Sequence, residues 1–313
     1  MTPLLDVDRV RVLLAGNTVG MLTMSPSRTL AFAYDKTWLT HGFSISPISL
    51  PLRDGVFVAQ RDPLNGMFGV FDDSMPDGWG RLLTDRMLRQ HGIDPYSVGP
   101  LARLSIVGHG GMGALEFRPT RGPRHRKATA VAISRLVVSA RNALSGKFDG
   151  DRETEAAITN LIQVGTSAGG ARAKAVIAWN PQTHEIRSGQ LPADPGFDYW
   201  LLKLDGVGKD HELGTGGFYG RIEYAYYLMA KAAGIEMFES RLLEENDRAH
   251  FMTRRFDRQN GSKQHIQTLC AMQHLDFKQR GTHDYNQYFQ AITALRLPET
   301  ALEEGFRRMV FNV

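Results

Sequence analysis

A run of small residues at 165–174 is the first segment whose composition suggests chemistry. It reads Gly-Thr-Ser-Ala-Gly-Gly-Ala-Arg-Ala-Lys and leads into an apolar strand pattern. Small residues let backbone N–H groups approach an anion closely, and Arg172 and Lys174 add positive charge. The segment could therefore bind phosphate, although a flexible connector would have the same composition. It matches neither the G-x-x-x-x-G-K-[ST] loop nor the G-x-G-x-x-G loop of ordinary protein kinases.

A second candidate is a lysine inside an apolar strand pattern, Lys203, which stands between two leucines. It could reach into a cleft and hold ATP phosphates, as the strand lysine of kinases does, or it could be an edge-strand lysine with its ammonium in water. The helical pattern that follows carries Glu223. Kinases pair such a glutamate with the strand lysine, whereas most helix glutamates are simply solvated. An apolar stripe lies beside Glu223, formed by Ile222, Ala225, Tyr226, Met229 and Ala233.

A charged segment at 253–258 ends the next strand pattern and reads Thr-Arg-Arg-Phe-Asp-Arg. A kinase hinge offers backbone donors and acceptors to adenine, and Phe256 could pack nearby; a charged strand end with internal ion pairs would read the same way. The four features follow the order of a kinase N-lobe, namely glycine-containing loop, strand lysine, helix glutamate and hinge. This order is the stronger indication, because each feature alone has an ordinary structural explanation.

The elements that must position these residues fall into three regions. Residues 1–120 are strand-rich, residues 121–150 form a basic connector and a helix, and residues 151–313 alternate strands with helices. Apolar runs at 10–14 and 19–22 flank turn residues and predict a hairpin. Further strands are expected at 30–34, 173–179, 199–204, 241–243 and 250–253, and helices at 79–90, 130–146, 153–163, 221–234, 284–296 and 299–313.

Composition narrows the classes of protein. The chain has 313 residues, of which 42% are hydrophobic and 22% charged, so about two ordinary globular domains are expected. The net charge of +4 fits a nucleotide partner, but no nucleic-acid-binding module accompanies it. The single cysteine, Cys270, excludes an intrachain disulfide, and the histidines show no metal-ligand spacing. Without a signal peptide or a long apolar run, we expect a cytoplasmic protein with no membrane segment.

The sequence resembles the HipA family of bacterial serine/threonine protein kinases, the toxins of toxin–antitoxin pairs. Residues 71–81, Phe-Asp-Asp-Ser-Met-Pro-Asp-Gly-Trp-Gly-Arg, resemble the F-x-D-x-x-P-D-x-W-G-R segment of its N-terminal region. Residues 108–117 resemble its glycine-rich G-A-L-x-F segment, and residues 166–175 resemble its S-x-x-G-A-R-x-K-A loop. Segments at 202–204, 223–224, 255–258 and 265–270 follow in the family order.

This resemblance implies an α+β fold, in which a β-rich N-terminal domain precedes a kinase N-lobe and the start of a helical C-lobe. It also implies ATP and Mg²⁺ as cofactors. Lys203 would contact the ATP phosphates with support from Glu223. Backbone around Arg254 and Phe256 would bind adenine.

The same resemblance gives the loop a role in holding phosphate. The amides of Gly169, Gly170 and Ala171 would approach the ATP phosphates, with Lys174 close by. Ser167 matches the serine that family members autophosphorylate. A phosphate on Ser167 would add about two negative charges. It would compete with ATP for the loop amides or displace the loop, so autophosphorylation is expected to inactivate the kinase.

The family pattern places a catalytic loop of the form N-x-D-D-H-x-x-N directly after the helix that ends at Val313, with a metal-binding aspartate beyond it. Neither segment occurs in these 313 residues. Phosphoryl transfer needs a residue that orients the hydroxyl and side chains that hold Mg²⁺. We therefore expect a truncated kinase that is inactive or nearly so, with no catalytic or metal-binding residue of its own.

Partners follow from the resemblance as well. It implies a HipB-like helix-turn-helix antitoxin, DNA contact only through that antitoxin, and a role in persistence. It suggests a protein substrate from translation, such as an aminoacyl-tRNA synthetase. A second hypothesis is a non-catalytic module that binds the antitoxin as a co-repressor or decoy. A third, an unrelated small-molecule enzyme, is disfavoured because no nucleophile–base set is visible.

Overall fold

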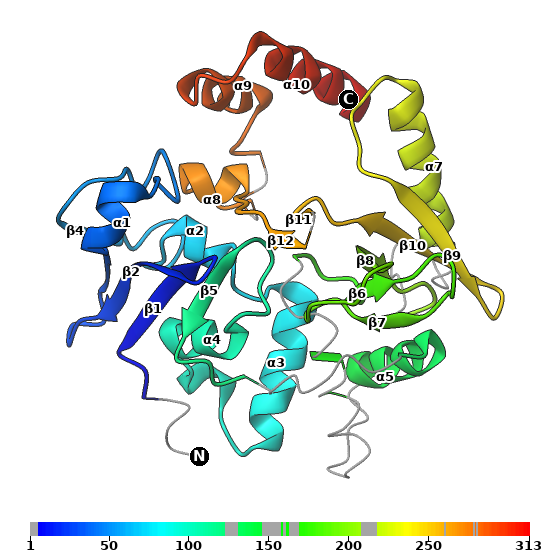
Figure 1. The fold of residues 1–313 in the computed structure, drawn as a ribbon, viewed down its shortest axis with the longest axis horizontal. Coiled ribbons are helices and arrows are strands. Elements are labelled where there is room, and N and C mark those ends of the chain that lie inside the picture. Colours follow the sequence, from blue (N-terminus) through cyan, green and yellow to red (C-terminus); the bar gives the residue numbers. More distant parts are fainter. Residues whose placement is uncertain are drawn as a thin grey trace.

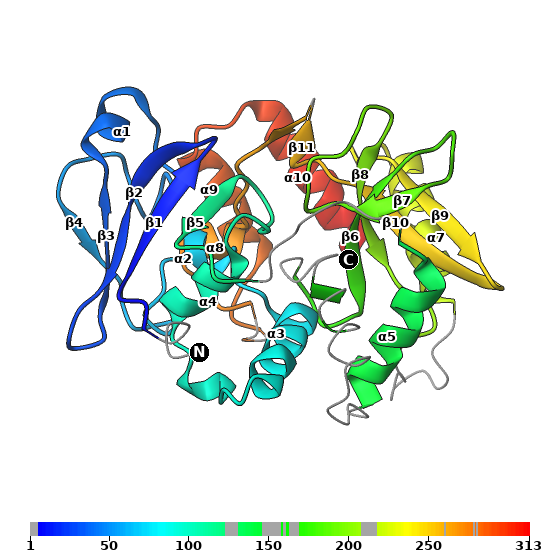
Figure 2. The same ribbon diagram turned by 60° about the horizontal axis from the view of Figure 1, so that its bottom comes forward.

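The computed structural model describes residues 6–122, 131–145, 158, 161–162, 169–207, 218–259, 261–277, 279 and 281–313. Two β-sheets form the two halves of the molecule, and helix α3 (Gly78–Gln90) lies between them (Figures 1 and 2). None of the helices in this part of the chain has the length and apolar character that crossing a bilayer requires.

The N-terminal sheet is antiparallel, with the strand order β4-β3-β2-β1-β5. Alternate residues of its strands are buried, which gives the sheet one core face and one solvent face. Phe32 anchors the core face, with its ring 5.2 Å from that of Phe71. The elements are β1 (Arg9–Leu14), β2 (Asn17–Met24), β3 (Leu30–Tyr34), β4 (Val56–Val58), β5 (Leu115–Arg118), α1 (Lys36–His41), α2 (Gly69–Asp72), the 3-10 helix η2 (Pro95–Ser97) and α4 (Pro100–Val107).

The second sheet is also antiparallel, with the order β7-β6-β8-β10-β9. Its strands are β6 (Lys174–Trp179), β7 (Ile186–Ser188), β8 (Asp198–Lys203), β9 (Ser240–Glu245) and β10 (Arg248–Arg254). One face packs against α5 (Ile133–Ser145) and α3, because Trp79 and Leu83 of α3 share a core with Trp200 and Leu202 of β8. Helix α3 therefore joins the core of the second sheet, although it lies within the first region of the sequence.

Helix α7 (Tyr219–Ala232) packs against β9 and β10. Gly220 makes this contact possible, since a Cβ there would lie 1.9 Å from the carbonyl oxygen of Ala249. Successive side chains of a strand point to opposite faces. Leu202 enters the core with α3 and α5, and its neighbour Lys203 points to the other face, toward α7.

The C-terminal elements connect the two halves. They are β11 (Arg258–Gln259), β12 (Ser262–Lys263), α8 (Leu269–Gln273), α9 (Tyr285–Ala294) and α10 (Glu299–Asn312). Helix α8 lies against α2 of the N-terminal half, and a Cβ on Gly69 would be 1.9 Å from the carbonyl oxygen of Ala271. Helix α10 crosses to the second half (Figure 1). There Arg308 donates to the carbonyl oxygen of Glu236 at 2.5 Å.

Most of the predicted elements are present near their expected bounds. The hairpin pairs β1 with β2, and the strands expected at 173–179, 199–204 and 250–253 are β6, β8 and β10. The helix expected at 153–163 lies largely outside the described residues. The elements that were not predicted are short, namely β4, β5, β7, β11, β12, α1, α2, α4, η2 and α8.

The apolar stripe on α7 does not face the sheet. Ile222, Tyr226 and Met229 are about half exposed, at 46%, 58% and 55%. The helix instead turns Gly220 and Ala230 inward, since small residues let its backbone approach β10 closely. An apolar stripe at helical spacing therefore did not identify the packed face here.

Candidate functional site

Lys203 and Glu223 meet in the structure. The Nζ of Lys203 donates to Oε2 of Glu223 at 2.5 Å, and both side chains are partly buried. Strand β8 fixes the lysine between β6 and β10, opposite Lys174 and Phe251. Arg172 approaches the other carboxylate oxygen of Glu223 at 3.9 Å. The sequence left open whether the Lys203 ammonium lies in water. In the structure, a carboxylate from the next helix holds it.

Lys174 forms the second positive group of the site. Its side chain is buried, and its ammonium donates to the carbonyl oxygen of Gly169. Burial lowers the pKa of Lys174; the charge of Asp77 opposes this effect, while that of Lys203 adds to it. Because Lys174 and Lys203 are direct partners across two strands, two cations lie side by side where the sheet meets the loop. Such a pair favours a polyanionic ligand.

The predicted phosphate loop is described from Gly169 onward, and Ser167 lies outside the described residues. The loop contacts the N-terminal part of α3 and the residue before it. The N–H of Gly170 donates to Oδ1 of Asp77 at 2.8 Å, and the N–H of Trp79 donates to the carbonyl oxygen of Gly170 at 3.1 Å. In the sequence, Asp77 stands out only as part of the family motif at 71–81. Nothing in its local pattern signalled a contact 93 residues away.

A pocket of about 720 Å³ lies at the predicted hinge. Leu201, two residues before Lys203 on β8, lines it, so the pocket and the lysine share one face of the sheet. Phe256 is 48% exposed and packs against Phe238, with ring centroids 5.6 Å apart. The other lining residues are Met112, Lys231, Glu236, Met237, Thr253, Arg254, Arg255, Asp257 and Arg308. A volume of this size and apolar aromatic walls suit a flat base such as adenine.

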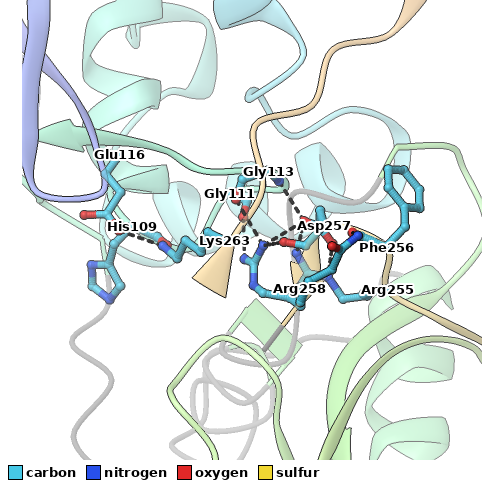
Figure 3. Close-up of polar contacts among 10 residues, drawn as sticks. His109, Gly111, Gly113, Glu116, Arg255, Phe256, Asp257, Arg258 and Lys263 are labelled. Carbon is cyan, nitrogen blue, oxygen red and sulfur yellow. Dashed lines mark hydrogen bonds and ion pairs between the residues drawn. The ribbon is translucent and has the colours of Figure 1, made fainter. Parts of the chain in front are cut away.

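The charged segment after β10 contains buried ion pairs, as its alternative interpretation predicted (Figure 3). Asp257 accepts from Nε and Nη2 of Arg255 at 2.8 and 2.6 Å, and from Nη1 of Arg258 at 2.8 Å. The N–H of Gly113, from the glycine-rich segment of the N-terminal half, also donates to Asp257 at 2.8 Å. The ion pair of Arg254 with Asp198 is more exposed. The segment can therefore be both a hinge and an ion-paired junction.

Burial and charge oppose one another in this cluster. Burial alone would raise the pKa of Asp257, but the hydrogen bonds and charges of the two arginines, with the Gly113 N–H, outweigh it and lower that pKa. Burial, with the repulsion of Arg255, lowers the pKa of Arg258 to about 10. The network thus keeps one carboxylate ionised between two guanidinium groups at neutral pH.

No group of three or more His, Cys, Asp or Glu side chains is arranged to hold a metal ion within the described part of the chain. The residues gathered at the site are the lysine–glutamate pair, Lys174, the loop amides and the hinge pocket. They place two lysine ammonium groups beside a pocket with apolar walls.

The structure defines an α+β protein with two five-stranded antiparallel sheets, the second of which carries the Lys203–Glu223 pair and borders the pocket. The model of the HipA N-terminal domain matches residues 10–118, and that of the HipA-like C-terminal domain matches residues 166–313. The chain belongs to the HipA family.

The fold is similar to that of a chain in the solved complex of HipA, HipB and operator DNA from the toxin–antitoxin system of Shewanella oneidensis MR-1. The TM-score is 0.62 at 18% sequence identity, and the likeness covers 97% of this chain and 68% of that one. The sequence has no significant match among proteins of curated function.

Proposed function

We propose that this chain is the ATP-binding toxin component of a HipA–HipB-like pair, and that its site is that of a serine/threonine protein kinase. The observation that carries the proposal is the ion pair of Lys203 with Glu223, on the face of the sheet that lines the hinge pocket. Kinases use this pair to hold the ATP phosphates in place while the hinge holds the base.

The described residues divide ATP binding between them. The walls at Leu201 and Phe256 would hold adenine in the hinge pocket, with backbone at Arg254 and Phe256 as its hydrogen-bonding partners. Lys203 would contact the phosphates, and Lys174 with the Gly169–Ala171 segment would surround them. Bound Mg²⁺ would supply charge that offsets the phosphates, and the described residues include no cluster of carboxylates arranged to hold it.

Calorimetry with ATP tests this proposal directly. Replacing Lys203 with methionine keeps the apolar stem and removes the ammonium, so ATP affinity should fall about tenfold or more. The matched control is Lys36→Met, which alters an exposed lysine of α1 in the N-terminal half and should leave ATP affinity unchanged. Equal affinity of the unaltered chain and Lys203→Met would contradict the proposed phosphate contact.

Phosphoryl transfer is a separate step of the proposal. These 313 residues contain no N-x-D-D-H-x-x-N motif, and we expect little or no transfer by this chain alone. Incubation with Mg-ATP and phosphopeptide mapping measures it. Phosphate on Ser167 that disappears in Ser167→Ala would show an active kinase with the family's autophosphorylation site, whereas phosphate mapped elsewhere would contradict that assignment.

A non-catalytic role is the second candidate. The chain would bind a HipB-like helix-turn-helix antitoxin and reach DNA only through it, as a co-repressor or decoy. The similar fold in the solved HipA–HipB–DNA complex favours this partner. Pull-down with the antitoxin at micromolar concentration, with and without ATP, tests it.

For the kinase proposal, a translation component such as an aminoacyl-tRNA synthetase remains the proposed substrate class, to be identified by phosphoproteomics.

A further inference from the structure

We propose that Asp77 is a positioning residue for the phosphate-binding loop. Its carboxylate, which comes from the N-terminal region of the chain, holds Gly170 and so fixes the backbone that approaches the ATP phosphates. The inference rests on the proposed ATP-binding function.

The segment Asp77–Trp79 holds both backbone groups of Gly170. The N–H of Gly170 donates to Oδ1 of Asp77 at 2.8 Å, and its carbonyl oxygen accepts from the N–H of Trp79 at 3.1 Å. A third bond runs from the indole N–H of Trp79 to the carbonyl oxygen of Lys174 at 3.1 Å. These three bonds attach both ends of the described loop to one short segment, which we call the loop clamp.

Asp77 performs this task instead of its ordinary one. It stands at the N-cap of α3, where an aspartate usually accepts from an N–H group of the first helical turn. Its side chain makes no such capping bond. The carboxylate is directed to a segment 93 residues away, so the loop receives the hydrogen bond that the helix forgoes.

The other two residues of the loop clamp fix its position. A Cβ on Gly78 would lie 2.6 Å from the carbonyl oxygen of Gly170, so any side chain there would push the loop away. The backbone of Gly78 also has a φ of +36°, which disfavours other residues. Trp79 is only 1% exposed and packs in the core with Leu83 and Ala175. The base of the clamp is therefore rigid, and the loop takes its position from α3.

Comparison of ATP with adenosine separates the loop from the hinge. In Asp77→Ala, the affinity for ATP should fall about tenfold, because a charge-assisted hydrogen bond to the loop is lost. Adenosine has no phosphates and does not need the loop, so the adenosine affinity of Asp77→Ala should stay within about twofold of that of the unaltered chain. Asp77→Asn keeps an oxygen acceptor and should retain most of the ATP affinity. Asp94→Ala, which removes the capping carboxylate of η2 away from the loop, is the matched control.

Hydrogen exchange at the Gly170 amide gives a readout that does not depend on nucleotide. It should be faster in Asp77→Ala and close to normal in Asp77→Asn. Unchanged or tighter ATP binding in Asp77→Ala would overturn the proposal, the tighter case showing that the carboxylate competes with phosphate. An equal loss of ATP and adenosine would also overturn it, as general destabilisation. If the unaltered chain bound neither ligand, the proposed function itself would fail.

Discussion

At the scale of single residues, Asp257 is the most constrained charge of the described site. Its side chain is 1% exposed, and Arg255 beside it is 3% exposed. Taking two charges out of water costs free energy that only their mutual contact offsets. Removing one partner leaves the other charge buried and unpaired. The free-energy cost of that unpaired charge exceeds the net stabilisation that the intact pair provides.

Asp257→Ala should therefore lower the free energy of unfolding by about 3–5 kcal/mol. The matched control is Asp198→Ala, which breaks the more exposed pair with Arg254 and should cost less than about 1 kcal/mol. Urea denaturation of both variants measures the difference. Similar costs for the two would show that the buried cluster is not a structural junction.

The buried side chain of His250 should make the free energy of unfolding sensitive to acid. It is fully buried, its Nδ1 accepts from the N–H of Asp205 at 2.8 Å, and burial lowers its pKa below the usual 6.5 although the charges of Asp205 and Glu245 oppose the shift. The unfolded chain then binds a proton more readily than the folded one. The contribution of His250 to the free energy of unfolding is thus present above pH 6.5. It is lost as the pH falls toward the lowered pKa of His250 in the folded protein.

The urea concentration at the unfolding midpoint should accordingly decrease as the pH is lowered from about 7 to about 5. Burial lowers the pKa of His265 and of His274 too, so they contribute in the same direction. His250→Asn, whose amide oxygen can replace Nδ1 as acceptor, should make the fall shallower. An identical pH profile for this variant would assign the acid sensitivity to other groups.

At the scale of elements, α7 decides whether Lys203 and Glu223 meet. Gly220→Ala would gain helix propensity in a free helix. Here its Cβ would lie 1.9 Å from the carbonyl oxygen of Ala249, so the helix must move off β10. We expect a loss of about 1–3 kcal/mol in unfolding free energy, and weaker ATP binding because Glu223 moves with the helix.

Met229→Ser on the exposed side of α7 is the control, and it should change the unfolding free energy by less than about 0.5 kcal/mol. Thermal melts and ATP titration of the two variants provide the comparison. A stable Gly220→Ala protein with normal ATP affinity would contradict the role of this close approach.

The sequence predicted strands better than helix faces, and the order of site residues better than their contacts. Alternating apolar runs specify a strand locally, which is why β1, β2 and β8 lay where expected. The packed face of α7 depends on how close its backbone comes to β10, and small residues at 220 and 230 carry a weak hydropathy signal. The pairing of Lys203 with Glu223 followed from family order. The contacts of Asp77 and Asp257 are tertiary, and no local pattern encodes them.

At the scale of the whole molecule, the two halves share structure. Helix α3 packs into the second core, α8 packs on α2, and Gly113 donates to Asp257. Thr268 reinforces the α8 contact by donating to Asp73 through its N–H and its hydroxyl. We therefore expect the two halves to unfold as one unit.

Amide hydrogen exchange tests this cooperativity. Protection of β3 in the first sheet and of β6 in the second should be lost at the same denaturant concentration. Leu83→Ala, which opens the core between α3 and the second sheet, should lower the unfolding free energy by about 2–5 kcal/mol and reduce protection in both sheets. Loss of protection in the second sheet alone would show two independent units.

The position of α3 also has a consequence for synthesis. Its indole at Trp79 finds a partner at Lys174, 95 residues further along the chain. At elongation rates of about 5–20 residues per second, these residues are made roughly 5–20 s apart. During that interval the apolar side of α3 has no second sheet to cover it. The nascent protein therefore passes through a stage at which the apolar side of this helix is uncovered and prone to non-native association.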